Sequence, residues 1–74
     1  MSADSWIISG DWEAVDSSWV NAIQWDGSAL NVEYNSGVIC AYNVDEHVAR
    51  GMYYADSKGS YVHAHLYNLP YTIK

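Results

Sequence analysis

The chain has 74 residues and a single cysteine, Cys40, so no disulfide can form within it. A domain of this size has room for one hydrophobic core, which alone rarely contributes more than about 3–5 kcal/mol of stability. Hydrophobic residues make up 50% of the chain and charged residues 16%, which is typical of a chain that folds. The sequence therefore predicts one small domain in a reducing, cytoplasmic setting, with homo-oligomerisation as an added source of stability.

The charge is unevenly distributed along the chain. The net charge is −6, while residues 38–74 have as many basic as acidic side chains and hold all three His. Binding to duplex nucleic acid needs Lys and Arg against phosphates, so we expect no such binding. The apolar runs are too short for a bilayer and the N-terminus lacks a signal-peptide pattern, so we expect no membrane association. The first 37 residues contain no Lys or Arg, and their acidic side chains are Asp4, Asp11, Glu13, Asp16, Asp26 and Glu33.

Three strands are predicted over residues 19–26, 30–35 and 38–44. The middle segment has the clearest alternation of apolar and polar residues, and short Gly-containing turns connect it to its neighbours. Such turns join antiparallel strands, so the three form a meander. The faces that the alternation predicts are Trp19, Asn21, Ile23 and Trp25 in the first strand, Leu30, Val32 and Tyr34 in the second, and Val38, Cys40, Tyr42 and Val44 in the third.

Helical patterns follow the strands. Asn43 fits an N-cap and Glu46 its reciprocal partner, and an apolar stripe then runs through Val44, Val48, Met52 and Ala55. Gly51 within this helix either allows close approach of another element or weakens the helix. Residues 60–67 fit a second, shorter helix, with a strand as the alternative. Pro70 is expected to end regular structure.

Residues 1–16 form an acidic segment that contains Trp6 and Trp12. This segment is interpreted as an arm, either packed on the body as an extra strand or exposed as a contact surface. Residues 17–74 form the domain itself. The predicted fold class is α+β: a three-stranded antiparallel meander, with a possible fourth N-terminal strand, packed against one or two C-terminal helices.

A motif runs through the second half of the chain. The helix over residues 44–55 leads into Ala-x-Ser-Lys-Gly-x-Tyr at residues 55–61, and Tyr67 or Tyr71 closes the pattern. Before it come the paired Ser at 17–18, Trp25-Asp26, Ser36-Gly37 and Tyr42-Asn43-Val44. In this order the signals resemble the KTSC domain family over residues 17–71. Its members are small domains found alone in bacterial and phage proteins, and at the C-terminus of some lysyl-tRNA synthetases. The resemblance implies a fold more than an activity.

The strongest local signal for ligand binding is Ser57-Lys58-Gly59, at the expected start of the second helix. A helix N-terminus presents N–H groups to an anion, Lys58 adds a positive charge, and Gly59 allows close access. A plain helix–helix turn with a capping Ser and a solvated Lys explains the same residues, so both interpretations stay open. The anion site that the first interpretation predicts consists of Arg50, Ser57, Lys58, Gly59, Ser60, Tyr61, His63 and His65.

Catalytic and metal sites have little support in the sequence. His63 and His65 share a face only in a strand, and His47, Cys40 or Asp56 would have to supply a third ligand. No motif fixes that geometry, so we predict no metal and no other cofactor. Cys40 alternates with core residues and no Ser lies in a nucleophile-elbow pattern, so we predict no enzymatic activity.

Two functional hypotheses follow. In the first, the chain is a phage-type interaction module that binds and inhibits a host protein of defence or nucleic-acid handling through charge complementarity. In the second, it sequesters a nucleotide-like signal at the anion site described above. An RNA- or tRNA-associated accessory role comes third, because the acidic balance argues against tRNA binding. The contact surface that the first hypothesis predicts consists of Trp6, Asp11, Trp12, Glu13 and Trp19.

Overall fold

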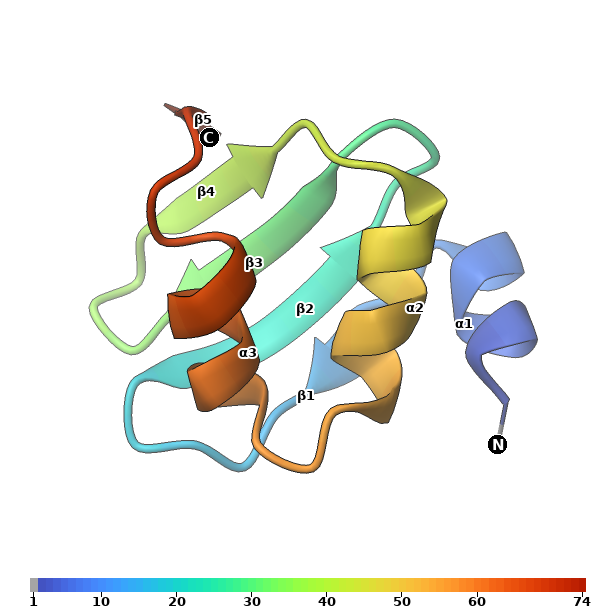
Figure 1. Ribbon diagram of the computed structural model, residues 1–74, viewed down its shortest axis with the longest axis horizontal. Helices are drawn as coiled ribbons and strands as arrows, with labels where there is room; N and C mark the ends of the chain where they lie inside the picture. The colour runs from blue at the N-terminus through green and yellow to red at the C-terminus, as the bar shows by residue number, and fades with distance from the viewer. Residues whose placement is uncertain (1) are drawn as a thin grey trace.

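The computed structural model describes residues 2–74, which form a five-stranded antiparallel sheet and three helices (Figure 1). The strands lie in the sheet in chain order, so the α+β meander predicted from the sequence is confirmed. Helices α2 and α3 cover one face of the sheet, and α1 lies beside α2 (Figure 1). No helix within residues 2–74 has the length and apolar character needed to cross a bilayer. The elements are α1 (Ala3–Ser9), β1 (Glu13–Ala14), β2 (Val20–Trp25), β3 (Leu30–Tyr34), β4 (Ile39–Tyr42), α2 (Glu46–Tyr54), α3 (Lys58–His65) and β5 (Tyr71–Ile73).

The buried face of β2 differs from the predicted alternation. The pairing of β2 with β3 shifts register just after Val20, as at a β-bulge. The extra residue changes which side chains point inward, so Val20 is fully buried together with Ile23 and Trp25. Trp19 precedes the strand and remains partly exposed, and Asn21 is exposed. The prediction that Trp19, Asn21, Ile23 and Trp25 share one face was therefore wrong.

Residues 2–16 are packed on the body of the domain, which is one of the two interpretations of this arm that the sequence left open. They contain α1, which ends at Gly10 in the left-handed conformation (φ 71°), and β1, which supplies the fourth strand. Trp6 on α1 is buried, and its ring stacks on Tyr53 of α2 with 5.2 Å between centroids. Arg50 of α2 forms ion pairs with Asp4 of α1 and, one helical turn away, with Glu46. Because Trp6 belongs to the core, the expectation that it offers an exposed contact was wrong.

Helix α2 begins two residues later than the sequence predicts. Its N-cap residue is Asp45 rather than Asn43, and the Asp45 side chain makes no capping hydrogen bond. Its fully buried residues are Ala49 and Met52, so the buried stripe is shifted relative to the predicted one. Val48 lies at the edge of the core, where it is partly buried.

Residues 58–65 are helical, which decides between the helix and the strand left open by the sequence. Gly51 makes room on α2 for Tyr61 of α3, because a Cβ there would overlap the hydroxyl of Tyr61. That hydroxyl donates to the carbonyl oxygen of Val48 at 3.0 Å. The chain then continues past Pro70 into β5, which pairs with β4. The expectation that regular structure ends at Pro70 was wrong by this one short strand.

Candidate functional site

A hollow of about 250 Å³ lies next to α1 and β1, and we call it the α1–β1 hollow. Four of the five residues predicted as a contact surface line it, whereas Trp19 lies elsewhere. Ser5 and Ser9 complete it; sequence reasoning missed them because Ser residues on a short helix carry no distinctive signal. The lining residues are Ser5, Trp6, Ser9, Asp11, Trp12 and Glu13.

The chain reversal after α1 positions the acidic side of this hollow. Ser9 bridges the reversal: its hydroxyl donates to the carbonyl of Trp6 at 3.2 Å and accepts from the N–H of Asp11 at 3.1 Å. The side-chain amide of Gln24 on β2 donates to the carbonyl of Gly10 at 2.8 Å. The Gln24 bond and the pairing of β1 with β2 attach this loop to the sheet, so the hollow is part of the folded body.

The charged side chains that line the α1–β1 hollow are all acidic. Within residues 2–74, Arg50 pairs with acidic residues of α1 and α2, and Lys74 pairs with Asp26. Neither Asp11 nor Glu13 forms an ion pair within that part of the chain. Trp12 is 40% exposed beside them, and the Nε1–H of Trp6 is buried without a partner among the described residues. A surface of carboxylates and an exposed indole attracts a cationic group.

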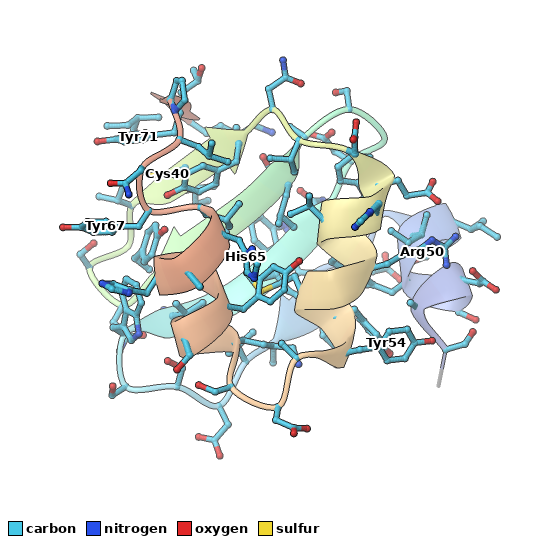
Figure 2. The ribbon with its side chains drawn as sticks, viewed as in Figure 1. Cys40, Arg50, Tyr54, His65, Tyr67 and Tyr71 are labelled. Carbon is cyan, nitrogen blue, oxygen red and sulfur yellow. The ribbon has the colours of Figure 1, made fainter. Side chains whose placement is uncertain are left out.

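A second hollow, of about 420 Å³, lies at the other side of the sheet near β4 and β5, and we call it the tyrosine groove. Figure 2 shows Tyr67, Cys40 and Tyr71 on this side of the molecule. The surplus of Tyr in the sequence predicted that some tyrosines line a groove. The pattern around Tyr34, Cys40 and Tyr42 indicates only core positions, so the sequence did not place these three in the groove. The lining residues are Trp19, Tyr34, Cys40, Tyr42, Tyr67 and Tyr71.

Ring contacts fix the inner part of the tyrosine groove. The hydroxyls of Tyr34 and Tyr42 are hydrogen-bonded at 2.7 Å, and Tyr34 stacks on Trp19 with 5.6 Å between centroids. The ring of Tyr71 packs on that of Tyr42 at a tilt, with 5.9 Å between centroids. Burial raises the pKa of Tyr34 and, more strongly, that of Tyr42, so both phenols are neutral at physiological pH.

The polar side chains at the start of α3 form hydrogen bonds within the protein. The Ser57 hydroxyl accepts from the N–H of Ser60 at 3.3 Å, which makes Ser57 the N-cap. The Lys58 ammonium donates to the carbonyl of Ala55 at 3.1 Å. Gly59 is buried, and a Cβ built on it would lie 2.5 Å from Nε1 of Trp19. These contacts match the plain helix–helix turn, in which Gly59 makes room for Trp19 rather than for a ligand.

The other residues of the predicted anion site have separate neighbours. Arg50 is bound to carboxylates at the α1–α2 contact (Figure 2). His63 packs on Tyr67 with 5.2 Å between ring centroids, and His65 packs on Tyr61 at 4.3 Å. The structure therefore does not gather the set into one site. Within residues 2–74, no three His, Cys, Asp or Glu side chains lie close enough together to hold a metal ion.

The comparisons with known proteins identify the domain. No curated protein matches this chain. The KTSC domain family matches residues 16–71. That range contains the whole tyrosine groove and all of α2 and α3, whereas the residues of the α1–β1 hollow precede it. Since the match covers most of the 74 residues, the chain belongs to the KTSC domain family.

Proposed function

We propose that this protein is a non-enzymatic interaction module that binds a basic segment of a partner protein in the α1–β1 hollow. One observation carries the proposal. Asp11 and Glu13, which have no cationic partner within residues 2–74, line the same hollow as the exposed ring of Trp12. An Arg or Lys side chain there meets carboxylates with its charge and an indole face with its flat or aliphatic part.

The small energy of each single contact determines what kind of partner is needed. A cation–π contact at an exposed site contributes about 0.5–1 kcal/mol, and an exposed ion pair about 0–1 kcal/mol. One basic side chain therefore binds only weakly, so the partner must present several. The net charge of −6 steers such a surface toward the protein and increases the association rate at low salt. A module that covers a basic, nucleic-acid-binding surface of a host protein would inhibit it, which is the biological role that we propose.

The test uses an Arg-rich peptide as the probe, with a peptide of equal length in which Gln replaces Arg. Binding to the full chain is measured by calorimetry at low and at physiological salt. In one variant the acids of the hollow are neutralised (Asp11→Asn with Glu13→Gln). We expect affinity to fall about two- to thirty-fold, which corresponds to losing two exposed ion pairs.

A matched control carries the same change of charge elsewhere. Glu33→Gln with Asp56→Asn also removes one Glu and one Asp, both outside the hollow. The proposal requires the hollow variant and Trp12→Ala to weaken binding more than this control does. Equal weakening by both double variants would mean that only the total charge matters, and would refute a defined site.

A further inference from the structure

We propose that the tyrosine groove is a second binding site, which holds the base of a free mononucleotide between its aromatic side chains. This inference does not depend on the basic-partner proposal. The two sites lie near opposite edges of the sheet, one beside β1 and the other beside β4 and β5.

The groove has a buried floor and an exposed aromatic rim. Tyr42 and Cys40 form the floor, at 4% and 6% exposure. Tyr67 and Tyr71 are 64% and 55% exposed, and with Trp19 they form the rim. The three rim rings come from the segment before β2, the loop after α3 and strand β5. Flat rings on several sides of a hollow favour a flat ligand, because every base has a π-face that stacks on Tyr or Trp.

The groove also contains polar groups that can pair with the edge of a base. In the Tyr34–Tyr42 hydrogen bond one hydroxyl donates and the other accepts. The accepting hydroxyl keeps its own hydrogen, and both oxygens keep a lone pair. The pair can therefore donate to a ring nitrogen or accept from an exocyclic amine. Among the described residues 2–74, no charged side chain lines the groove, so the part of the ligand that enters it is uncharged.

The distribution of charge favours an anionic group on the rest of the ligand. From residue 57 to the end of the chain there is no Asp or Glu, while His63, His65 and Lys58, whose ammonium donates to the carbonyl of Ala55, lie in this part. The ring of His63 packs on Tyr67, so an imidazole lies beside the rim. A phosphate at this side meets no carboxylate of its own segment, in contrast to the acidic α1–β1 hollow. The phosphate of a mononucleotide therefore meets less repulsion here than at the α1–β1 hollow.

The size of the groove favours one nucleotide over a strand. Small-molecule sites commonly occupy about 300–1,000 Å³, and the groove measures about 420 Å³. A strand of RNA or DNA needs a track of Lys and Arg along its phosphates. The chain has only three such residues, of which Arg50 and Lys74 are engaged in ion pairs. A free mononucleotide is therefore the ligand that the observations favour.

The experiment titrates the full chain with adenosine monophosphate (AMP) at millimolar concentration and follows backbone amide signals by NMR. Parallel titrations use uridine monophosphate, inorganic phosphate and a six-base single-stranded RNA. We expect AMP to shift the amides of Tyr34, Cys40 and Tyr71, and phosphate alone to leave them in place. Tyr67→Ala should weaken AMP binding about 5- to 150-fold, the range expected for loss of one stacking ring.

Two variants keep this result interpretable. Tyr54→Ala removes a tyrosine of the same 64% exposure that lies outside the groove, and should leave AMP affinity unchanged. Tyr67→Phe retains the ring and should bind AMP as the wild type does. The proposal is overturned if AMP does not shift the groove amides, or if Tyr54→Ala weakens binding as much as Tyr67→Ala. RNA binding at the groove without AMP binding would overturn it as well.

Discussion

Asp26 is the residue at which the turn between β2 and β3 is fixed. Its carboxylate accepts from the backbone N–H groups of Ser28 and Ala29, each at 2.9 Å, and from the side chain of Asn31 at 3.1 Å. The Lys74 ammonium lies 3.3 Å away. The hydrogen bond from the Ser28 N–H, followed by the other donors, holds the pKa of Asp26 well below its usual range. Folding therefore favours the charged form of this side chain.

This lowered pKa predicts a pH-dependent contribution to stability. The contribution is complete above the unfolded-state pKa of about 3.9, and is lost as the pH falls through the lower folded-state pKa. Asp26→Asn should reduce the free energy of unfolding by about 1 kcal/mol at pH 7, since one charge-assisted acceptor is lost. Urea unfolding from pH 7 to pH 2 should show the difference from wild type shrinking below about pH 4. A difference that stays constant over this range would contradict the assigned pKa.

At the scale of elements, α3 depends on Ser57 for its first turn. The Ser57 hydroxyl is the side-chain acceptor for an N–H of that turn, and α3 has only eight residues. Ser57→Ala should lower the free energy of unfolding by about 0.5–2 kcal/mol, and Ser57→Asp should restore most of it. Chemical denaturation of the three proteins measures this. If the alanine variant is as stable as the wild type, the Ser of the Ala-x-Ser-Lys-Gly-x-Tyr motif has a role other than capping.

The elements also show what the sequence could and could not predict. The meander and both later helices were predictable, because period-two alternation and turn residues are local signals. The bulge after Val20 was not, since it depends on pairing with β3 and exchanges Trp19 for Val20 in the core. Helix α1 had a signal in Gly10 as its C-terminal cap, but two adjacent Ile favour a strand. Strand β5 has three residues and exists through its pairing with β4.

For the site residues too, those close in sequence were predictable and those placed by long-range contacts were not. Asp11, Trp12 and Glu13 are close in sequence, so a local argument could group them, and they do line one hollow. Arg50 and Lys58 were grouped by chemistry alone, and long-range contacts separate them: Arg50 binds Asp4, and Lys58 turns back to Ala55. Local sequence patterns do not predict which residues come together only through tertiary packing.

At the scale of the whole molecule, residues 2–15 lie outside the matched family range yet complete its core. Trp6 is 4% exposed and packs on α2, whereas Trp12, six residues later, is 40% exposed. A buried Trp replaced by Ala costs about 3–5 kcal/mol, which is about all that a core of this size supplies. Trp6→Ala should therefore be largely unfolded at 25 °C, while Trp12→Ala should keep its stability within about 0.5 kcal/mol.

Thermal unfolding followed by near-ultraviolet circular dichroism distinguishes these two variants. We expect a cooperative transition close to that of the wild type for Trp12→Ala, and none for Trp6→Ala. A chain that lacks residues 1–15 should behave as Trp6→Ala does, because it loses the same indole from the core. If the shortened chain instead unfolds cooperatively near the wild-type temperature, the N-terminal segment is an appendage, and Trp6 variants become usable in binding experiments. If it does not, Trp12 rather than Trp6 is the tryptophan that reports on the partner surface, because lost binding in Trp6→Ala would reflect unfolding.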